Sequence, residues 1–499
     1  MLKKISILIS LLFICSCSHP IIYEISTRPW LYELSIKYKK PITKLNDIPL
    51  KEFDELQKNG VDIVWMMGVW KLGEYGLEFD RKQDYTPYLP NWTKEDVIGS
   101  PFAVYEYTCN PSIGDNGDLS WLKARINERG MKLMLDFVPN HSAVDAPQAK
   151  EKPEMYIRAP KGQEIDENRY TKEGIAYGTE ESHYYVWKDV IQWNYWNNDT
   201  FNFMYDNIDR IMNWADAIRC DVAWQQLNDV FYLTWPTELD SYGYTRPKQE
   251  FWEYAIKKAK NVNPNIMFLA ESYSEEYNEK LIKLGFDYVY NIDILHKLKE
   301  SGNAFKEYIK DKTGPFWKYK ANFVENHDED RIVANMGGNP QKAKAAGTIA
   351  ATIGGLIFIN HGQWEGRKNK LDVHLRRGLE EPDNEEIKNY YKKLHQVIKD
   401  KAFRGNNFYY AGVLDGERKD DFIAYIREEE DSHYLVVVNF SENEGCATIP
   451  IYNLRGRRYI LVYDVLNDVE IVKTYDIVKN YGLKVCLKAW ESQIFKYNY

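Results

Sequence analysis

Four short apolar runs each end in polar, proton-handling residues, and they constrain the fold more than any other feature of the chain. The runs are Leu133–His141, Ala217–Val222, Met267–Ser272 and Asn322–Asp328. Apolar runs of this length are typical of strands that are covered on both faces, as in a parallel sheet wrapped by helices. Because the active-site residues of a (β/α)8 barrel lie at the ends of several different strands, the pattern predicts such a barrel.

Alternating strand and helix patterns support this architecture. Helices are predicted at Leu50–Lys58 and Leu119–Arg129, between the first strands. The strand candidates, in chain order, are Trp30–Leu34, Val61–Met67, Lys132–Val138, Ile218–Val222, Ile266–Ala270, Phe286–Tyr290, Ala321–Glu325 and Leu356–Asn360. Eight is the number that a closed barrel needs, so we expect an α/β fold with a TIM barrel over residues 27–403.

Two segments do not fit a strand–helix repeat. Residues 142–195 are long, polar and irregular, which predicts an inserted loop subdomain after the third strand. After residue 403 the pattern changes to short strands such as Phe422–Arg427 and Tyr434–Phe440. This change predicts a C-terminal antiparallel β-sandwich over residues 404–499.

The N-terminus has the pattern of an export signal. Lys3 and Lys4 precede an apolar run, Ile5–Ile14, that is about half of the ~20 residues a membrane-spanning helix needs. The sequence that follows resembles a bacterial lipobox, with Cys17 as the lipidated first residue of the mature chain. We therefore expect a signal peptide over residues 1–16 and a lipid-anchored tether over residues 17–26.

This reading predicts a location in the bacterial cell envelope, exported and held to the membrane by the lipid. The periplasmic and outer-surface faces both stay open. The alternative that residues 1–17 belong to an ordinary signal peptide that contains cysteine also stays open.

Composition and charge exclude some classes of partner and site. Lys+Arg 65 against Asp+Glu 74 gives a net charge of −9 without a basic stripe, which argues against nucleic acid as a partner. Beyond the signal, the cysteines are Cys109, Cys220, Cys446 and Cys486. Their spacing does not match a zinc site, and their pairing in an exported protein cannot be read from the sequence.

The four runs together supply three carboxylates and two imidazoles. These are Asp221, Glu271, Asp328, His141 and His327. A single aspartate at the end of a strand is most often a turn or capping residue. Three carboxylates at the mouth of one barrel instead form the chemical set that retaining glycoside hydrolysis uses.

The same four runs resemble, in order, the four short sequence regions of the α-amylase superfamily, glycoside hydrolase family 13. The matching stretches are Asp136–His141 (DFVPNH), Arg219-Cys220-Asp221, Ala270-Glu271 and Asn326-His327-Asp328. The resemblance covers roughly Trp30 to the C-terminus. It implies a glycoside hydrolase, a retaining α-glycosidase that acts on α-linked glucans or oligosaccharides in carbohydrate metabolism.

The resemblance also implies a role for each residue. Asp221 matches the nucleophile that forms a covalent glycosyl-enzyme, Glu271 the general acid/base, and Asp328 the third carboxylate, which binds sugar hydroxyls. Arg219 is expected to orient Asp221, because residues two apart on a strand point to the same face.

Three further residues have implied roles in binding. His141 and His327 match the pair that hydrogen-bonds the sugar in the −1 subsite. Asn140 matches a residue that helps to bind calcium in many family members. One asparagine is a weak candidate for an ion that takes six to eight oxygen ligands, and no cofactor is required by the expected mechanism.

The chain departs from the family pattern where the family contacts its substrate. Ser100–Ala103 replaces the usual His-Gly-Tyr-Asp, so Phe102 can stack on a sugar without offering a hydroxyl. Trp224 and Gln225 stand where many amylases carry Lys-His, and Asn360–Glu365 replaces another family motif. These changes leave the reaction type intact and put the substrate in doubt.

Two alternatives follow. One is an α-transglycosylase, or a sucrose- or trehalose-processing enzyme of the same family. The other is a non-catalytic carbohydrate-binding lipoprotein. Such a protein should have lost at least one of the carboxylates, and all three are present.

Overall fold

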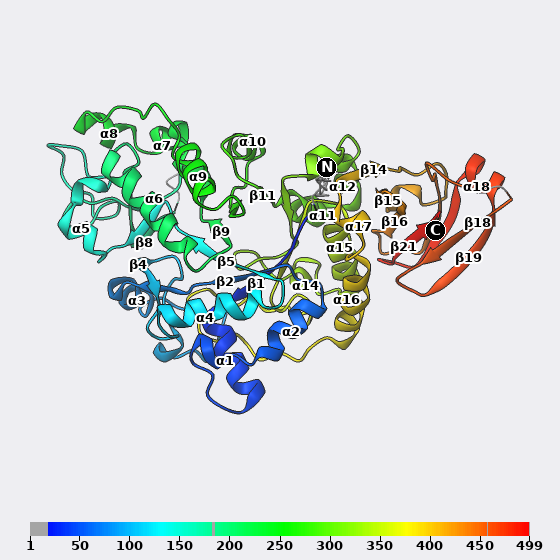
Figure 1. Cartoon of the computed structure of the whole chain (residues 1–499), viewed down its shortest axis with the longest axis horizontal. Helices are drawn as coiled ribbons and strands as arrows, with labels where there is room; N and C mark the ends of the chain where they lie inside the picture. Colours follow the sequence, from blue (N-terminus) through cyan, green and yellow to red (C-terminus); the bar gives the residue numbers. More distant parts are fainter. Residues whose placement is uncertain (1–17, 182–184, 457, 499) are drawn as a thin grey trace, which may run out of the picture.

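Parallel strands close into an eight-stranded barrel in the computed structural model, which describes residues 18–181, 185–456 and 458–498 (Figure 1). The strands are β1 (Ile21–Ser26), β2 (Ile63–Met67), β5 (Lys132–Phe137), β9 (Ala217–Cys220), β10 (Met267–Ala270), β11 (Tyr288–Asn291), β12 (Lys320–Asn322) and β13 (Leu356–Asn360). Each strand pairs with the next one along the chain, and β13 closes on β1. The predicted TIM barrel is therefore confirmed.

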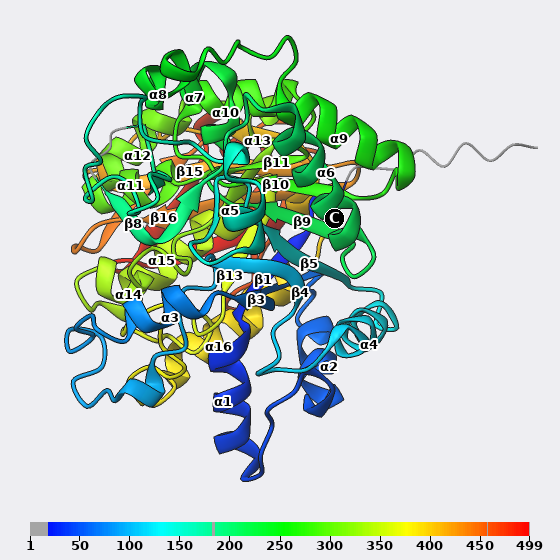
Figure 2. The same cartoon turned by 90° about the vertical axis from the view of Figure 1, so that its left-hand side faces the viewer.

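Helices cover the outside of the barrel (Figure 2). They include α2 (Leu50–Lys58), α4 (Asn116–Asn127), α6 (Asn198–Met212), α9 (Phe251–Val262), α10 (Glu275–Lys283), α11 (Asp293–Glu300), α12 (Gly302–Ile309), α15 (Pro340–Thr352) and α16 (Glu385–Val397). In α2, Phe53 and Leu56 are three residues apart and are both buried, as a helix with one apolar face requires. The side chain of Asp115 caps α4 by accepting hydrogen bonds from the N–H groups of Gly117 and Asp118.

The first strand of the barrel was predicted in the wrong place. Trp30–Leu34 belongs to helix α1 (Thr27–Tyr38), and its buried residues include Trp30, Leu31 and Leu34, the spacing of one helical face. The strand is β1, inside the segment predicted as a tether over residues 17–26. His19 is already fixed there, since its ring nitrogens lie 3.1 Å from the Tyr288 hydroxyl and 2.7 Å from Asn406 Oδ1.

The inserted segment after β5 contains a small sheet of its own, at the left of Figure 1. Its strands are β6 (His141–Ala143), β8 (Val186–Gln192) and β7 (Tyr177–Thr179), in that spatial order and antiparallel. The sequence predicted an irregular insert here, and three short strands now account for part of it. His141 begins β6 and pairs with Gln192, so the insert starts at a predicted site residue.

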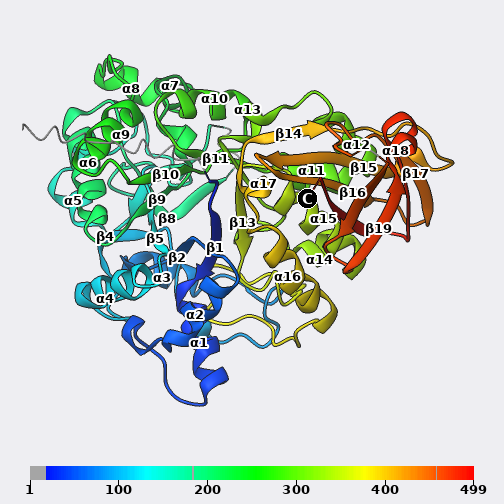
Figure 3. The same ribbon diagram turned by 45° about the vertical axis from the view of Figure 1, so that its right-hand side comes forward.

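The C-terminal part is antiparallel β structure beside the barrel, as predicted (Figure 3). A six-stranded sheet contains β14 (Asn407–Tyr410), β15 (Phe422–Glu429), β16 (Ser432–Asn439), β21 (Ser492–Tyr497), β18 (Tyr459–Asp464) and β19 (Val469–Thr474), in that order. A second pair, β17 (Gly445–Ile449) and β20 (Leu483–Leu487), packs its buried side chains with those of the six-stranded sheet in one apolar cluster. Alternate residues of β20 are buried, the period-2 pattern of a strand with one face on a core.

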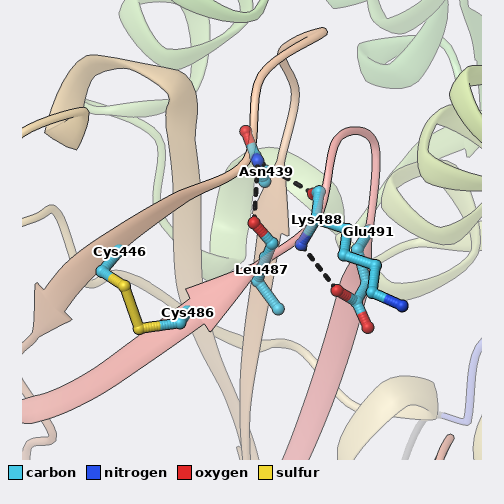
Figure 4. Close-up of a disulfide and its surroundings, with 6 residues drawn as sticks. All are labelled: Asn439, Cys446, Cys486, Leu487, Lys488 and Glu491. Atoms are coloured by element: carbon cyan, nitrogen blue, oxygen red, sulfur yellow. Dashed lines mark hydrogen bonds between the residues drawn. A yellow bond between two sulfur atoms is a disulfide. The ribbon is translucent and has the colours of Figure 1, made fainter.

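A disulfide joins Cys446 to Cys486 across this second pair (Figure 4). The two cysteines are direct partners in the register of β17 and β20. Nearby, the Asn439 side chain donates a 2.9 Å hydrogen bond to the Lys488 carbonyl and so holds the chain just after β20. Cys109 and Cys220 are buried free thiols.

The described residues contain no helix that is long and apolar enough to cross a membrane. Cys17 and the predicted signal peptide, residues 1–16, lie outside the described residues.

Candidate active site

The register of two neighbouring strands brings Asp221 and Glu271 side by side. Cys220 of β9 is the partner of Ala270 of β10, so the next residue on each strand leaves the same edge of the barrel. The Glu271 N–H donates a 3.0 Å hydrogen bond to the Cys220 carbonyl, which continues the pairing beyond the strand ends. Residues fifty positions apart in the chain therefore become neighbours.

One buried guanidinium holds both carboxylates. Arg219 is fully buried inside the barrel, and its Nη1 donates to Asp221 Oδ1 at 2.6 Å. Its Nη2 donates to Glu271 Oε2 at 2.5 Å. The predicted role of Arg219 in orienting Asp221 agrees with this contact, and the contact with Glu271 was not predicted.

A strained turn supplies a second donor to Glu271. Val222 directly follows Asp221 and has a φ of +36°, in the left-handed region that a β-branched residue rarely adopts. In this conformation its N–H donates a 2.8 Å hydrogen bond to Glu271 Oε2. Backbone strain of this kind occurs at functional sites, where the surrounding structure maintains it.

The third carboxylate is paired with a histidine in the loop that follows β12. Asp328 Oδ2 lies 3.0 Å from Nε2 of His327, and Nδ1 of the same ring lies 2.5 Å from Glu24 Oε1. Burial lowers the pKa of His327, but Asp328 and Glu24 outweigh this effect and raise it well above its usual value. His327 is therefore a buried imidazolium that offsets part of the negative charge of the site.

The three carboxyl groups differ in their affinity for a proton. Burial raises the pKa of Glu271 to about 7, opposed by Arg219 and assisted by the charges of Asp221 and Asp328. Burial also raises the pKa of Asp221, with Arg219 opposing. For Asp328, burial acts in the same direction, but the charge of His327 prevails and holds the pKa at about 2. Environments that push the pKa values of neighbouring carboxyl groups apart allow one group to act as an acid while another stays ionised.

Phe102 belongs to the same cluster. Its ring centroid lies 5.3 Å from the guanidinium carbon of Arg219 and 5.4 Å from the His327 ring. The ring therefore lies beside the guanidinium that holds Asp221 and Glu271, and its stacking on a sugar stays a prediction.

His141 packs against the inserted segment. Among the described residues, no hydrogen bond or ion pair joins it to the Arg219 cluster. Its ring packs on Trp187 at 5.5 Å, and burial lowers its pKa to about 4, so that it is neutral at pH 7.

The surroundings of Asn140 do not fit a calcium ion. Its Oδ1 accepts hydrogen bonds from Nε2 of Gln192 at 2.9 Å and of Gln226 at 3.4 Å. Amide donors thus occupy the oxygen that would bind the ion, whereas calcium takes six to eight oxygen ligands. In the described ranges, no group of three or more His, Cys, Asp or Glu residues could hold a metal ion.

Two residues that depart from the family pattern, Trp224 and Gln225, share one partner in the inserted segment. Trp224 Nε1 donates to Glu181 Oε2 at 2.9 Å, and the Gln225 side chain donates to the same oxygen. Glu181 comes from the inserted segment and was missed in the sequence, where nothing distinguishes it from other surface acids. Tyr273, whose hydroxyl contacts Glu271, was also missed, because nothing in the sequence distinguishes it from the other 37 tyrosines.

The chain is similar to known α-amylases in sequence and in fold. The family model described as "Alpha amylase, catalytic domain" matches residues 53–413. The chain is 22% identical to "Alpha-amylase MalA" of Haloarcula japonica over 440 residues, which cover 86% of this chain and 56% of that protein. It is 22% identical to "Alpha-amylase 3" of Dictyoglomus thermophilum, with 68% of this chain and 74% of that protein covered.

Among solved structures, the chain is similar to a noncanonic maltogenic α-amylase, AmyB, from Thermotoga neapolitana. The TM-score is 0.70 at 21% identity, and the similarity covers 96% of this chain and 98% of that one. The likeness shows a shared fold. Because the match to the catalytic-domain model extends over more than half of the sequence, the chain belongs to the α-amylase family, glycoside hydrolase family 13.

Proposed function

We propose that the protein is a retaining α-glycosidase that hydrolyses α-glucosidic bonds in α-glucans or oligosaccharides through a covalent glycosyl-enzyme. The observation that carries this proposal is the contact of Asp221 and Glu271 with the same guanidinium of Arg219. One guanidinium can contact both carboxyl groups only if they lie close together. This fits the separation of about 5–5.5 Å found in retaining enzymes better than the wider gap of inverting ones.

In the first step Glu271 acts as the acid. It transfers its proton to the glycosidic oxygen while Asp221 Oδ attacks the anomeric carbon, so the glycosidic bond breaks and a glycosyl ester of Asp221 forms. Asp328, ionised beside His327, is the group to bind sugar hydroxyls and to stabilise positive charge that develops on the ring.

In the second step Glu271 acts as the base. It accepts a proton from water as the water oxygen attacks the anomeric carbon, and the ester bond to Asp221 breaks. Two displacements at one carbon restore the α configuration. Glu271 is then protonated again and Asp221 is again a free carboxylate, as at the start.

The pKa values predict a bell-shaped dependence of kcat/KM on pH. Glu271 must be protonated for the first step, so kcat/KM should fall as pH rises through about 7. Asp221 must be ionised, so kcat/KM should also fall on the acid side, as pH drops through its raised pKa. Initial rates on maltotriose across the pH range measure both limbs, and an alkaline limb near the ordinary glutamate pKa of about 4.3 would contradict the assignment of Glu271.

Product analysis on maltooligosaccharides tests hydrolysis itself. We expect shorter oligosaccharides, maltose or glucose to accumulate from the first time points. Products longer than the substrate, appearing before glucose or maltose, would instead identify a transglycosylase. Transglycosylation is the second candidate because Trp224 and Gln225, with their partner Glu181, alter the residues where an acceptor sugar would bind. If no α-glucoside is turned over, both enzyme proposals fail and the non-catalytic carbohydrate-binding role remains.

We also propose that the protein is exported and lipid-anchored through Cys17 in the bacterial cell envelope. The sequence of residues 1–17 supports this, and so does the Cys446–Cys486 disulfide, because disulfides persist in oxidising compartments outside the cytosol. Labelling with a radioactive fatty acid should mark the wild-type chain and leave Cys17→Ser unmarked. Equal label on both would contradict the anchor.

A further inference from the structure

Tyr273 lies beside Glu271, and no step of the proposed mechanism uses it. It follows β10, two residues beyond Glu271, and its hydroxyl donates a 2.6 Å hydrogen bond to Glu271 Oε1. Tyr273 is 39% exposed whereas Glu271 is 4% exposed, so the tyrosine lies between solvent and the buried carboxyl group.

The two oxygens of Glu271 are not equivalent. Oε2 accepts hydrogen bonds from Arg219 Nη2 at 2.5 Å and from the Val222 N–H at 2.8 Å. Neither donor can become an acceptor, because a guanidinium and a backbone amide have only N–H groups to offer. When Glu271 is protonated, the proton must therefore be on Oε1, the oxygen that Tyr273 contacts.

We propose that Tyr273 is a positioning residue that controls the transfer of the proton at Glu271 Oε1 and so favours the base step over the acid step. This inference rests on the proposed function. As a carboxylate, Oε1 accepts the Tyr273 hydroxyl hydrogen bond, which stabilises the charge. As an acid, Oε1–H must point at the glycosidic oxygen, and the Tyr273 hydroxyl has to turn away or accept.

The charged groups that face Glu271 remain unchanged when Tyr273 is altered. They are Arg219 and Asp221 at the end of β9 and Asp328 after β12. The Tyr273 ring has its own packing, with ring centroids 5.7 Å from Trp224 and 6.2 Å from Tyr290. Phenylalanine at position 273 keeps these ring contacts and removes only the hydroxyl.

Tyr273→Phe provides the test, through two pH profiles. The alkaline limb of kcat/KM on maltotriose should move upward by about one pH unit, because loss of a donor to the carboxylate favours the protonated form. The leaving group of α-glucosyl fluoride needs no acid, so with this substrate the base step limits kcat. Because the base step needs ionised Glu271, the acid limb of the kcat profile should also move to higher pH. Tyr481→Phe is the matched control, since Tyr481 is 70% exposed on α18 (Tyr475–Tyr481), and it should leave both limbs in place.

A Tyr273 that only packs in the site would give a different result. Both limbs would stay where they are while KM changes, and this outcome would overturn the inference. If Tyr273→Phe does not fold, 3,5-difluorotyrosine at position 273 replaces it. Its more acidic hydroxyl is a stronger donor, so the limbs should move downward. Unchanged limbs would again reject the inference.

Failure of this inference can be distinguished from failure of the proposed function. If the wild type turns over α-glucosides and the limbs do not move, only the role of Tyr273 is wrong. If the wild type turns over none, the proposed function fails, and ¹³C NMR titration of the carboxyl of Glu271 still tests the contact. With the signal assigned by its loss in Glu271→Gln, the pKa of Glu271 should be about one unit higher in Tyr273→Phe, and an equal pKa would reject the contact.

Discussion

Asp221→Ala should lower kcat on maltooligosaccharides by about 10⁴-fold or more, the loss expected when one member of a covalent catalytic unit is removed. Asp221 is the carboxylate that Arg219 hydrogen-bonds beside Glu271, whereas Asp136 lies 3.6 Å from Nη1 of the same guanidinium. The cavity left by the side chain can admit a small anion. Added azide should then restore turnover of α-glucosyl fluoride and give the β-glucosyl azide, since a single displacement inverts the anomeric carbon.

The control is Asp420→Asn, which removes an aspartate whose side chain is 86% exposed, in the C-terminal part of the chain just before β15. It should retain wild-type kcat. If Asp221→Ala kept more than about a tenth of wild-type kcat, the carboxylate would not be the nucleophile, because tenfold corresponds to only about 1.4 kcal/mol of transition-state stabilisation. An azide product with the α configuration would contradict the single displacement.

Glu271→Gln should lower kcat/KM on maltotriose by about 10²- to 10⁴-fold, the usual contribution of general acid–base catalysis. Glutamine keeps the shape of the side chain and an oxygen for Arg219 and Val222, but it cannot donate a proton to the leaving group. The loss in kcat/KM should therefore be much smaller for α-glucosyl fluoride than for maltotriose. The alkaline limb of the pH profile should disappear with the carboxyl group that produces it.

Glu276→Gln is the matched control, because Glu276 lies five residues away on α10 with a side chain that is 72% exposed. Its activity and pH profile should match the wild type. Equal losses of Glu271→Gln on maltotriose and on the fluoride would show that position 271 shapes the site without transferring a proton.

The barrel was predictable because its signals are local. A buried strand is an apolar run, and the residues that end each run can be read directly from the sequence. Strand β13 (Leu356–Asn360) and helix α2 (Leu50–Lys58) were predicted to the residue. The nucleophile, the acid/base and the third carboxylate were recognised because each one ends such a run.

The first strand was missed because its local signal is ambiguous. β1 carries Glu24 in the middle of an apolar run, and a charged residue there argues against a buried strand. In the structure Glu24 is buried and contacts His327. Trp30 and Leu34 then offered a more apolar alternative four residues apart, which is the period of a helix. Only the partner His327, about three hundred residues away in the segment after β12, explains why a buried glutamate is tolerated.

The second layer of the site could not be predicted, because it depends on contacts between distant segments. The sequence does not indicate that the backbone of Val222 turns into the left-handed region, or that Glu181 of the insert meets Trp224 and Gln225. It likewise does not indicate which oxygen of Glu271 the Tyr273 hydroxyl contacts. These contacts require the register of β9 and β10 and the position of the inserted segment.

Trapping of the covalent intermediate tests the central claim most directly. A 5-fluoroglycosyl fluoride of α-gluco configuration should glycosylate the protein quickly and be released slowly, and mass spectrometry of peptides from the trapped protein locates the sugar. The proposed mechanism predicts one glycosyl group, attached to Asp221, and none on the Asp221→Ala variant. A sugar attached to any other residue, or turnover of the fluoride with no trapped protein and an inverted product, would contradict it.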